Sequence, residues 1–318
     1  MGGTTLRIVS VSLGSSKRDK VVKAELLGVP LSLERVGVDG RLYRAIELIT
    51  ILSPEVHAFG LGGIDLYLYA GDRRYVVRDA LKLARAAGTT PVADGSLLKR
   101  ILEPEQVQWL LREHPEIPLR GRRVLMVSAV DRTGMACVLS EAAGEIVFGD
   151  FMFGLGLPIP LRRYRSVVNL GRALLPVLTR LPFQVLYPTG EKQEKVQPKQ
   201  RRWLDWAEVI AGDFHFIRRN LPERLDGKVI LTNTTTGEDR QLLRERGLNH
   251  LVTTTPVIEG RSFGMNMLEA SLHALIRHFG DQPSEANFRV YLNKLQLRPA
   301  IFQLQQEATP EQTPAAER

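Results

Sequence analysis

The sequence predicts an α/β protein with an N-terminal α/β domain and a C-terminal Rossmann-type doubly wound parallel sheet. Its 318 residues suffice for about two domains of roughly 150 residues each. Hydrophobic residues make up 44% and charged residues 25%, as in ordinary globular proteins. In the second half, short apolar runs alternate with helical segments, which predicts right-handed crossovers and a parallel sheet. We expect a substrate domain at 1–118, the Rossmann-type domain at 119–262, C-terminal helices at the domain junction over 263–306, and a disordered tail at 307–318.

The first half alternates strands and helices. Gly28-Val29-Pro30 and Gly71-Asp72 mark two hairpins, and residues 42–52 have apolar side chains at helical spacing. Prolines 115 and 118 make 114–120 the expected linker. The predicted strands are 6–13, 21–27, 31–36, 56–61, 66–69, 75–77 and 91–94, and the predicted helices are 42–52, 79–87, 96–102 and 104–113.

Six apolar runs in the second half predict six strands. They are residues 123–130, 145–151, 184–187, 208–211, 228–233 and 250–254. Six parallel strands in the order 3-2-1-4-5-6 form the sheet of dinucleotide-binding domains. Two apolar helices, 263–279 and 284–297, are expected to follow and to pack at the domain junction.

Composition narrows the classes of partner. The net charge is +8, but the basic residues are spread along the chain, and the denser segments 162–165 and 192–202 are not interleaved with aromatics. Nucleic acid is therefore not the expected ligand. No apolar stretch approaches about 18 residues, so we expect no membrane span. One cysteine, Cys137, excludes an intramolecular disulfide and fits a reducing, cytoplasmic location. The histidines show no metal-ligand spacing, and a homodimer remains open.

Residues 122–150 form the strongest candidate nucleotide site. A strand leads into a polar turn, a helix of small residues follows, and the next strand ends at Asp150. The helix N-terminus would offer N–H groups to a pyrophosphate. Asp150 would accept hydrogen bonds from ribose hydroxyls and repel a 2′-phosphate, so NAD is favoured over NADP. The candidate cofactor-binding residues are Val130, Asp131, Arg132, Thr133, Gly134 and Asp150, with Thr234 and Gly264 from later loops.

Each of these assignments has an alternative. The fingerprint G-x-G-x-x-G is absent, since the turn supplies one glycine, Gly134, so the unit could be an ordinary crossover without a cofactor. Thr234 follows a predicted strand, where a threonine also serves as a helix cap. Gly264 could face a nicotinamide or simply form a tight turn.

The N-terminal domain supplies the candidates for substrate binding and catalysis. Loops after two predicted strands contain the candidate substrate-binding residues Ser15, Gly62, Gly63 and Asp65. Oxidation of an alcohol requires a group that takes its proton, which a lysine beside a carboxylate can do. The candidate catalytic residues are Lys82, Asp94 and Lys99.

We expect either Asp79 with Lys82, or Asp94 with Lys99, to point into an interdomain cleft. That cleft would also contain Gly62, Thr234 and Met265. In the alternative interpretation, the aspartates cap helices and the lysines project into solvent.

Four segments carry a resemblance to a known family. They are VSLGSS, FGLGGIDLYL, RDALKLAR and VTTTPVIEGRSFGMNMLEA. They resemble a small bacterial family labelled quinate 5-dehydrogenase, within the shikimate/quinate 5-dehydrogenase superfamily. The resemblance implies an NAD(P)-dependent oxidoreductase acting on a small polar hydroxy acid. It does not assign the catalytic lysine or aspartate, which remain candidates by residue type. The alternatives are a regulatory binder of a nucleotide or phosphometabolite, and a group transferase with a nucleotide-linked donor.

Overall fold

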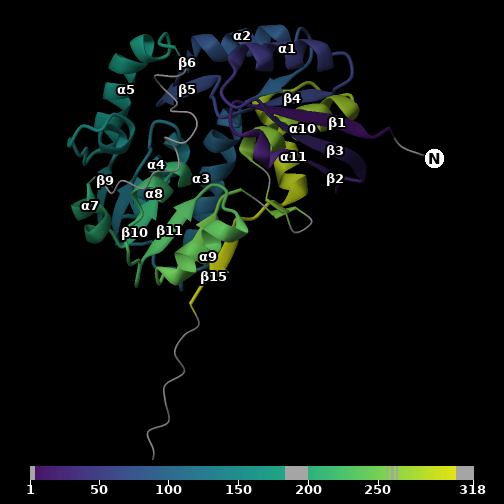
Figure 1. Cartoon of the computed structure of the whole chain (residues 1–318). Coiled ribbons are helices and arrows are strands. Elements are labelled where there is room, and N and C mark those ends of the chain that lie inside the picture. Colours follow the sequence, from purple (N-terminus) through teal and green to yellow (C-terminus); the bar gives the residue numbers. More distant parts are fainter. Residues whose placement is uncertain (1–3, 183–199, 256, 259–260, 263, 306–318) are drawn as a thin grey trace, which may run out of the picture.

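The computed structural model describes residues 4–182, 200–255, 257–258, 261–262 and 264–305 (Figure 1). The predicted strand at 184–187 and the expected tail at 307–318 lie outside these residues. The described chain forms two α/β lobes, each built on its own sheet, which confirms the predicted fold class.

The N-terminal sheet has five strands in the order β2-β3-β1-β4-β7. All neighbouring pairs are parallel except the hairpin of β2 with β3. Its two-residue turn places Leu27 and Gly28 at φ 53° and 78°, as in the primed turns that match strand twist. The strands are β1 (Leu6–Ser12), β2 (Lys20–Leu26), β3 (Val29–Gly37), β4 (Ala58–Gly62) and β7 (Val92–Ala93).

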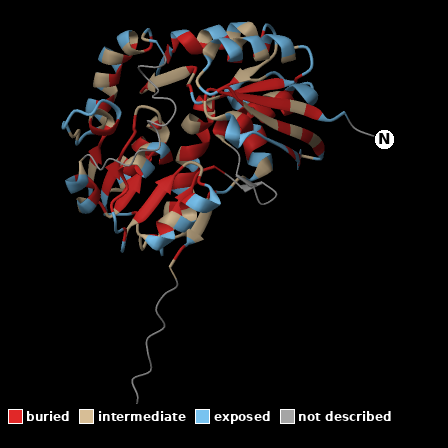
Figure 2. Ribbon diagram, viewed as in Figure 1, coloured by how far each residue is buried: buried red, intermediate tan, exposed pale blue. Residues whose placement is uncertain are grey.

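Helices cover both faces of this sheet because its central strand is apolar on both sides. Val9 and Val11 of β1 pack in one core with α1 (Leu42–Leu52) and α2 (Arg78–Ala86). Ile8 of β1 packs in a second core with α10 (Met265–His278). Figure 2 shows the resulting buried layer between the exposed outer faces of the helices.

The C-terminal sheet has the order β15-β12-β11-β10-β8-β9. Five neighbouring strands, β9, β8, β10, β11 and β12, are parallel and follow the predicted order. The sixth strand corrects the sequence analysis: residues 300–303, assigned to the C-terminal helical region, pair antiparallel with β12. Ile301 and Phe302 pack into the two different cores of the sheet, as alternating strand residues do. The strands are β8 (Arg123–Met126), β9 (Glu145–Phe148), β10 (Val209–Ala211), β11 (Val229–Thr232), β12 (His250–Thr253) and β15 (Ala300–Gln303).

The other elements cover this sheet or join the lobes. The hairpin of β5 and β6 belongs to the N-terminal half and packs against α5. A Cβ on Gly171 of α5 would lie 3.0 Å from the Ala70 Cβ of β5, so the two approach closely. The remaining elements are β5 (Tyr67–Ala70), β6 (Arg73–Val76), α4 (Thr133–Ala142), a π-helical turn (Asp150–Gly154), α5 (Tyr164–Leu178), α7 (Arg201–Trp206), α8 (Phe214–Asn220), α9 (Gly237–Glu245), β13 (Val257–Ile258), β14 (Arg261–Ser262) and α11 (Glu285–Leu295).

Helix α3 (Ser96–Glu113) lies between the lobes (Figure 1). Leu98 and Ile101 near its start pack with α10 and α11, whereas Val107 and Leu110 belong to the C-terminal core. Pro104 lies inside the helix without ending it, so the two helices predicted at 96–102 and 104–113 are one. The helix thus connects both lobes before the expected linker at 114–120. No described helix is long and apolar enough to cross a membrane.

Candidate functional site

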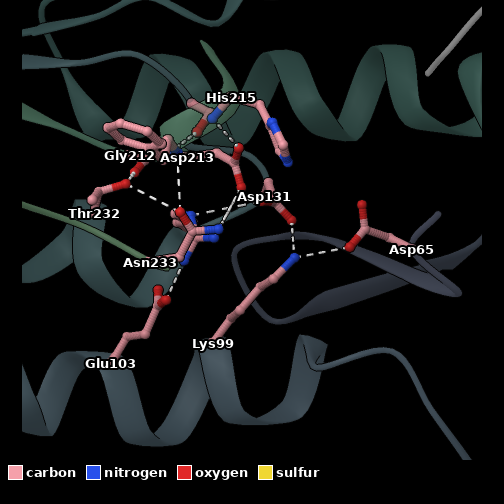
Figure 3. Close-up of polar contacts among 12 residues, drawn as sticks. Asp65, Lys99, Glu103, Asp131, Gly212, Asp213, His215, Thr232 and Asn233 are labelled. Atoms are coloured by element: carbon pink, nitrogen blue, oxygen red, sulfur yellow. Dashed lines mark hydrogen bonds and ion pairs between the residues drawn. The ribbon is translucent and has the colours of Figure 1, made fainter. Parts of the chain in front are cut away.

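Polar loops meet at the carboxyl edge of the C-terminal sheet, and α3 covers that edge. This is where parallel α/β sheets bind their ligands. Side chains from α3 and from the loops after β4, β8, β10, β11 and β12 form one connected network (Figure 3). We call it the interdomain cluster: Asp65, Lys99, Glu103, Asp131, Arg132, Asp213, Asn233 and Thr254.

Lys99 joins the two lobes. Its Nζ lies 2.8 Å from Asp65 Oδ1, after β4 of the N-terminal sheet, and 2.5 Å from Asp131 Oδ1, after β8 of the C-terminal sheet (Figure 3). Burial by itself would lower the pKa of Lys99, but the carboxylates of Asp131 and Asp65 raise it above its ordinary value. Lys99 is therefore a fixed ammonium at neutral pH and not a base.

Asp65 has a pKa raised above that of an ordinary aspartate. Burial raises its pKa to about 6, and the nearby charge of Lys99 only partly opposes that effect. The side chains of Lys99, Asp65 and Asp131 keep 12%, 17% and 23% of their exposure, so they are mostly but not completely buried. A proton acceptor and a fixed cation thus lie next to each other at the junction of the two lobes.

Arg132 occupies the buried side of the cluster with a side chain only 1% exposed. It pairs with Glu103 of α3, and its Nη2 lies 3.2 Å from Asp213 Oδ2. Glu103 also accepts a hydrogen bond of 3.0 Å from the hydroxyl of Thr254. Burial raises the pKa of Glu103, while Arg132 opposes the change. These buried contacts join α3 to the loops after β8, β10 and β12.

Asp213 and Asn233 fix the loops after β10 and β11. Asp213 accepts the His215 backbone N–H at 2.9 Å and the Asn233 amide at 2.9 Å. Although burial acts to raise the pKa of Asp213, the charges of His215 and Arg132 bring it down to about 2. Asp213 therefore stays a carboxylate. Asn233 in turn accepts the backbone N–H of Phe214 at 3.0 Å.

The turn predicted to hold a pyrophosphate is engaged by the protein itself. Asp150 Oδ1 accepts the backbone N–H groups of Ala129 and Val130 at 2.8 and 2.9 Å. A Cβ on Gly134 would lie 2.9 Å from the Lys99 carbonyl oxygen and 2.9 Å from Pro104 Cδ, so α3 covers the start of α4. Burial raises the pKa of Asp150 to about 6.

The expected cofactor residues make contacts within the protein in this conformation. Asp131 and Arg132 form ion pairs, and the carbonyl of Thr133 accepts a hydrogen bond of 3.4 Å from Tyr164. Thr234 bonds the Thr255 hydroxyl at 2.9 Å. Gly264 precedes α10, which packs on the N-terminal sheet.

Of the two predicted acid–lysine pairs, Asp94 with Lys99 does not form, and Asp79 with Lys82 forms outside the interdomain cluster. Asp94 accepts backbone N–H groups of Leu66, Tyr67 and Ser96 at 2.6, 2.8 and 3.0 Å, so its oxygens are not available to Lys99. Lys82 pairs with Asp79 at 2.8 Å, but its side chain is 52% exposed and belongs to α2, outside the cluster. Of the three candidates, Lys99 alone belongs to the interdomain cluster.

Of the predicted substrate-binding residues, Asp65 belongs to the cluster. Ser15 accepts the backbone N–H of Lys17 at 3.2 Å and caps a short 3-10 helix (Ser16–Arg18). A Cβ on Gly62 would lie 2.8 Å from Ser12 Oγ, so β1 leaves no room for one. Gly63 has φ +72°, a turn conformation that favours glycine.

Glu103, Asp213 and Asn233 were not among the site residues predicted from the sequence. A signal was present for each. Glu103 lies among apolar residues of a helix, where a carboxylate must find a partner. Asp213 and Asn233 directly follow predicted strands, at the edge where ligands bind.

Several solved structures are similar over most of the chain. A glutamate dehydrogenase from Thermus thermophilus has 10% identity and a TM-score of 0.43, covering 92% of this chain and 74% of that one. A sugar ABC transport substrate-binding protein from Bordetella parapertussis has 12% identity and a TM-score of 0.36, covering 88% and 82%. A galactofuranose binding protein has 12% identity and a TM-score of 0.36, covering 92% and 98%. At these scores the similarities carry no inference about function.

None of the curated proteins matches the sequence at a significant level. Two family models match adjoining parts of it. Residues 7–94 match the model described as Domain of unknown function (DUF8753), and residues 97–304 match a second model. The border falls at the start of α3, so the second region includes the helix that bears Lys99 and Glu103. Because that match covers more than half of the chain, the protein belongs to the family described as Domain of unknown function (DUF8754).

Proposed function

We propose that the protein binds a small polyhydroxylated molecule at the interdomain cluster and performs acid–base chemistry on one of its hydroxyl groups. The observation that carries this proposal is the position of Lys99, held between Asp65 of one lobe and Asp131 of the other. These three side chains are partly accessible and come from both sides of the domain junction.

The cluster offers both kinds of hydrogen-bonding group that a hydroxyl needs. A hydroxyl donates one hydrogen bond and accepts others. The carboxylates of Asp65 and Asp131 can accept, and the ammonium of Lys99 can donate. Asp65, with a pKa of about 6, can take the hydroxyl proton, while Lys99 stabilises the negative charge that develops on the oxygen.

The local charge favours the hydroxyl-bearing part of a ligand over an anionic group. Asp65, Asp131, Asp213 and Glu103 supply four carboxyl groups, against the two cations Lys99 and Arg132. A carboxylate or phosphate placed here would meet mainly negative charge. A hydroxy acid of the quinate or shikimate type would therefore present its ring hydroxyls to this cluster.

A binding panel tests the proposal. Quinate, shikimate, inositol and simple aldoses are each added to the wild-type protein and to the variants Asp65→Asn, Asp131→Asn and Lys82→Met. Thermal unfolding of each protein is then measured with and without the ligand. A ligand at a hundredfold excess over its Kd should stabilise the wild type and Lys82→Met by about 2.7 kcal/mol, and the two cluster variants far less. Absence of any stabilisation, or equal stabilisation of all four proteins, contradicts the proposal.

A second candidate is oxidation of the bound hydroxyl by a nicotinamide cofactor, with NAD favoured over NADP. The order of the parallel strands β9 to β12 favours it, because dinucleotide-binding sheets share that order. Against it stand the contacts of Asp150 and of α3 at the turn, which such a cofactor would have to displace. Saturable binding of NAD to the wild type would support this candidate.

A further inference from the structure

A cavity whose lining shares no residue with the interdomain cluster lies where α1 and α2 begin. Its volume is about 750 Å³, within the range of small-molecule sites. The lining comes from the start of α1, the start of α2 and the segment after α5. It consists of Gly40, Arg41, Leu42, Tyr43, Arg44, Arg78, Asp79, Lys82, Arg180 and Pro182.

The lining of this cavity is strongly basic. Five of its side chains are cationic, and Asp79 contributes its one carboxylate. Arg41, Arg44 and Lys82 are partly neutralised by Asp39, Glu47 and Asp79. Within the part of the chain that the structure describes, the guanidinium groups of Arg78 and Arg180 have no hydrogen-bond or ion-pair partner. Two arginines at one cavity without an acidic partner leave an excess of positive charge there.

The backbone adds to that positive potential. Neither α1 nor α2 has a side-chain N-cap, although the Arg78 N–H of α2 donates to the Thr179 carbonyl oxygen at 2.9 Å. Two helix starts therefore direct the positive ends of their dipoles toward the same cavity. This adds to the arginines and does not by itself define a site.

We propose that this cavity binds the phosphate group of a phosphorylated small molecule, through Arg78 and Arg180. Guanidinium groups bind phosphate oxygens in a bidentate manner, and the cavity has room for the remainder of a nucleotide or of a sugar phosphate. The site is independent of the proposed function, because none of its lining residues belongs to the interdomain cluster. Lys82, which the sequence predicted to be catalytic, would lie beside the bound phosphate in this site.

The test is a calorimetric titration of the full chain at physiological ionic strength. The probes are inorganic phosphate, pyrophosphate, AMP, ATP and glucose 6-phosphate, which separate a free phosphate from a nucleotide or sugar source. The test variant is Arg78→Ser with Arg180→Ser. The control is Arg85→Ser with Arg112→Ser, which removes the same charge from exposed positions outside the cavity, one of them on α2.

We expect saturable binding of at least one phosphorylated probe to the wild type. The affinity should fall at least tenfold in the test variant and less than twofold in the control. Equal losses in both double variants mean only general attraction to a basic surface and overturn the proposal. So does the absence of saturable binding with every probe.

Discussion

The carboxylate of Asp150 accepts the backbone N–H of Val130 at 2.9 Å, at the turn where a dinucleotide would place its pyrophosphate. The same oxygen accepts the neighbouring N–H of Ala129. A carboxylate of the chain therefore occupies two backbone donors at the start of the turn predicted to bind phosphate. The fold has the strand order of nucleotide-binding sheets, but this contact shows that the fold alone does not identify the ligand.

Addition of NAD or NADP should not change the thermal stability of the wild-type protein. Binding would have to break both contacts of Asp150 and move α3 away from Gly134. A true ligand at a thousandfold excess over its Kd would stabilise by about 4 kcal/mol, which a melting experiment detects readily. A shift of that size with NAD would make the dehydrogenase the better explanation, and Asp150→Ser should then narrow the preference for NAD over NADP.

Lys99→Met should destabilise the protein by about 3–5 kcal/mol, because it leaves Asp65 and Asp131 facing each other without the cation between them. Lys82→Met is the matched control: it breaks a half-exposed pair with Asp79 and should cost less than about 1 kcal/mol. Urea unfolding at neutral pH measures both. Similar costs for the two variants would show that Lys99 does not hold the lobes together.

Glu103→Gln should cost about 3 kcal/mol, since it removes the negative charge that compensates a buried arginine, Arg132. Glu105→Gln on the same helix breaks an exposed pair with Arg289 and should cost less than about 1 kcal/mol. Both free energies come from urea unfolding. A small cost at Glu103 would mean that the buried arginine is satisfied without it.

Glu269 of α10 makes the stability of the fold depend on pH, and its raised pKa fixes the sign of that dependence. Burial, with the charge of Asp94, raises its pKa from 4.5 to about 8. The folded state therefore binds more protons than the unfolded state between these values, and stability falls as pH rises from 4.5 to 8. Glu269→Gln removes this contribution, so its stability relative to wild type should improve by at most about 1.4 kcal/mol per pH unit across that range. Unfolding free energies from pH 5 to 9 measure it.

Glu285→Gln is the control for that series. Burial acts to raise the pKa of Glu285, but its hydrogen bonds to Arg289 and Arg100 lower it overall. Its contribution is therefore already complete above pH 4.5, and the difference from wild type should stay constant between pH 5 and 9. A slope for Glu285→Gln equal to that of Glu269→Gln would assign the effect to some other group.

Gly134→Ala should destabilise by about 1–3 kcal/mol, although alanine favours a helix, because its Cβ would press on the Lys99 carbonyl and on Pro104. Gly237→Ala, at the first position of α9, meets no atom within 4 Å and should be neutral or stabilise by up to about 1 kcal/mol. Thermal unfolding distinguishes the two. If Gly134→Ala also stabilises, α3 does not pack closely on α4.

Much of the fold could be predicted because its patterns are local. Apolar runs predicted the five parallel strands β9, β8, β10, β11 and β12 and their order in the sheet. Helical spacing of apolar residues predicted α1 over residues 42–52. The short strand at residues 300–303 was missed, because four residues carry too little pattern and its hydrogen bonds go to β12, about fifty residues earlier. Pro104 suggested a helix end that packing against both lobes overrides.

The sequence by itself determined which residue types stand at the strand ends and on α3, and so it indicated Lys99, Asp65 and Asp131 as candidates. Only the tertiary structure decided that these three meet, while Asp94 turns to backbone N–H groups. The physical reason is distance along the chain. Lys99 lies 34 residues from Asp65 and 32 from Asp131, so their pairing depends on how two separate sheets are placed against one helix. Local periodicity reports burial and turns, but it holds no information about that placement.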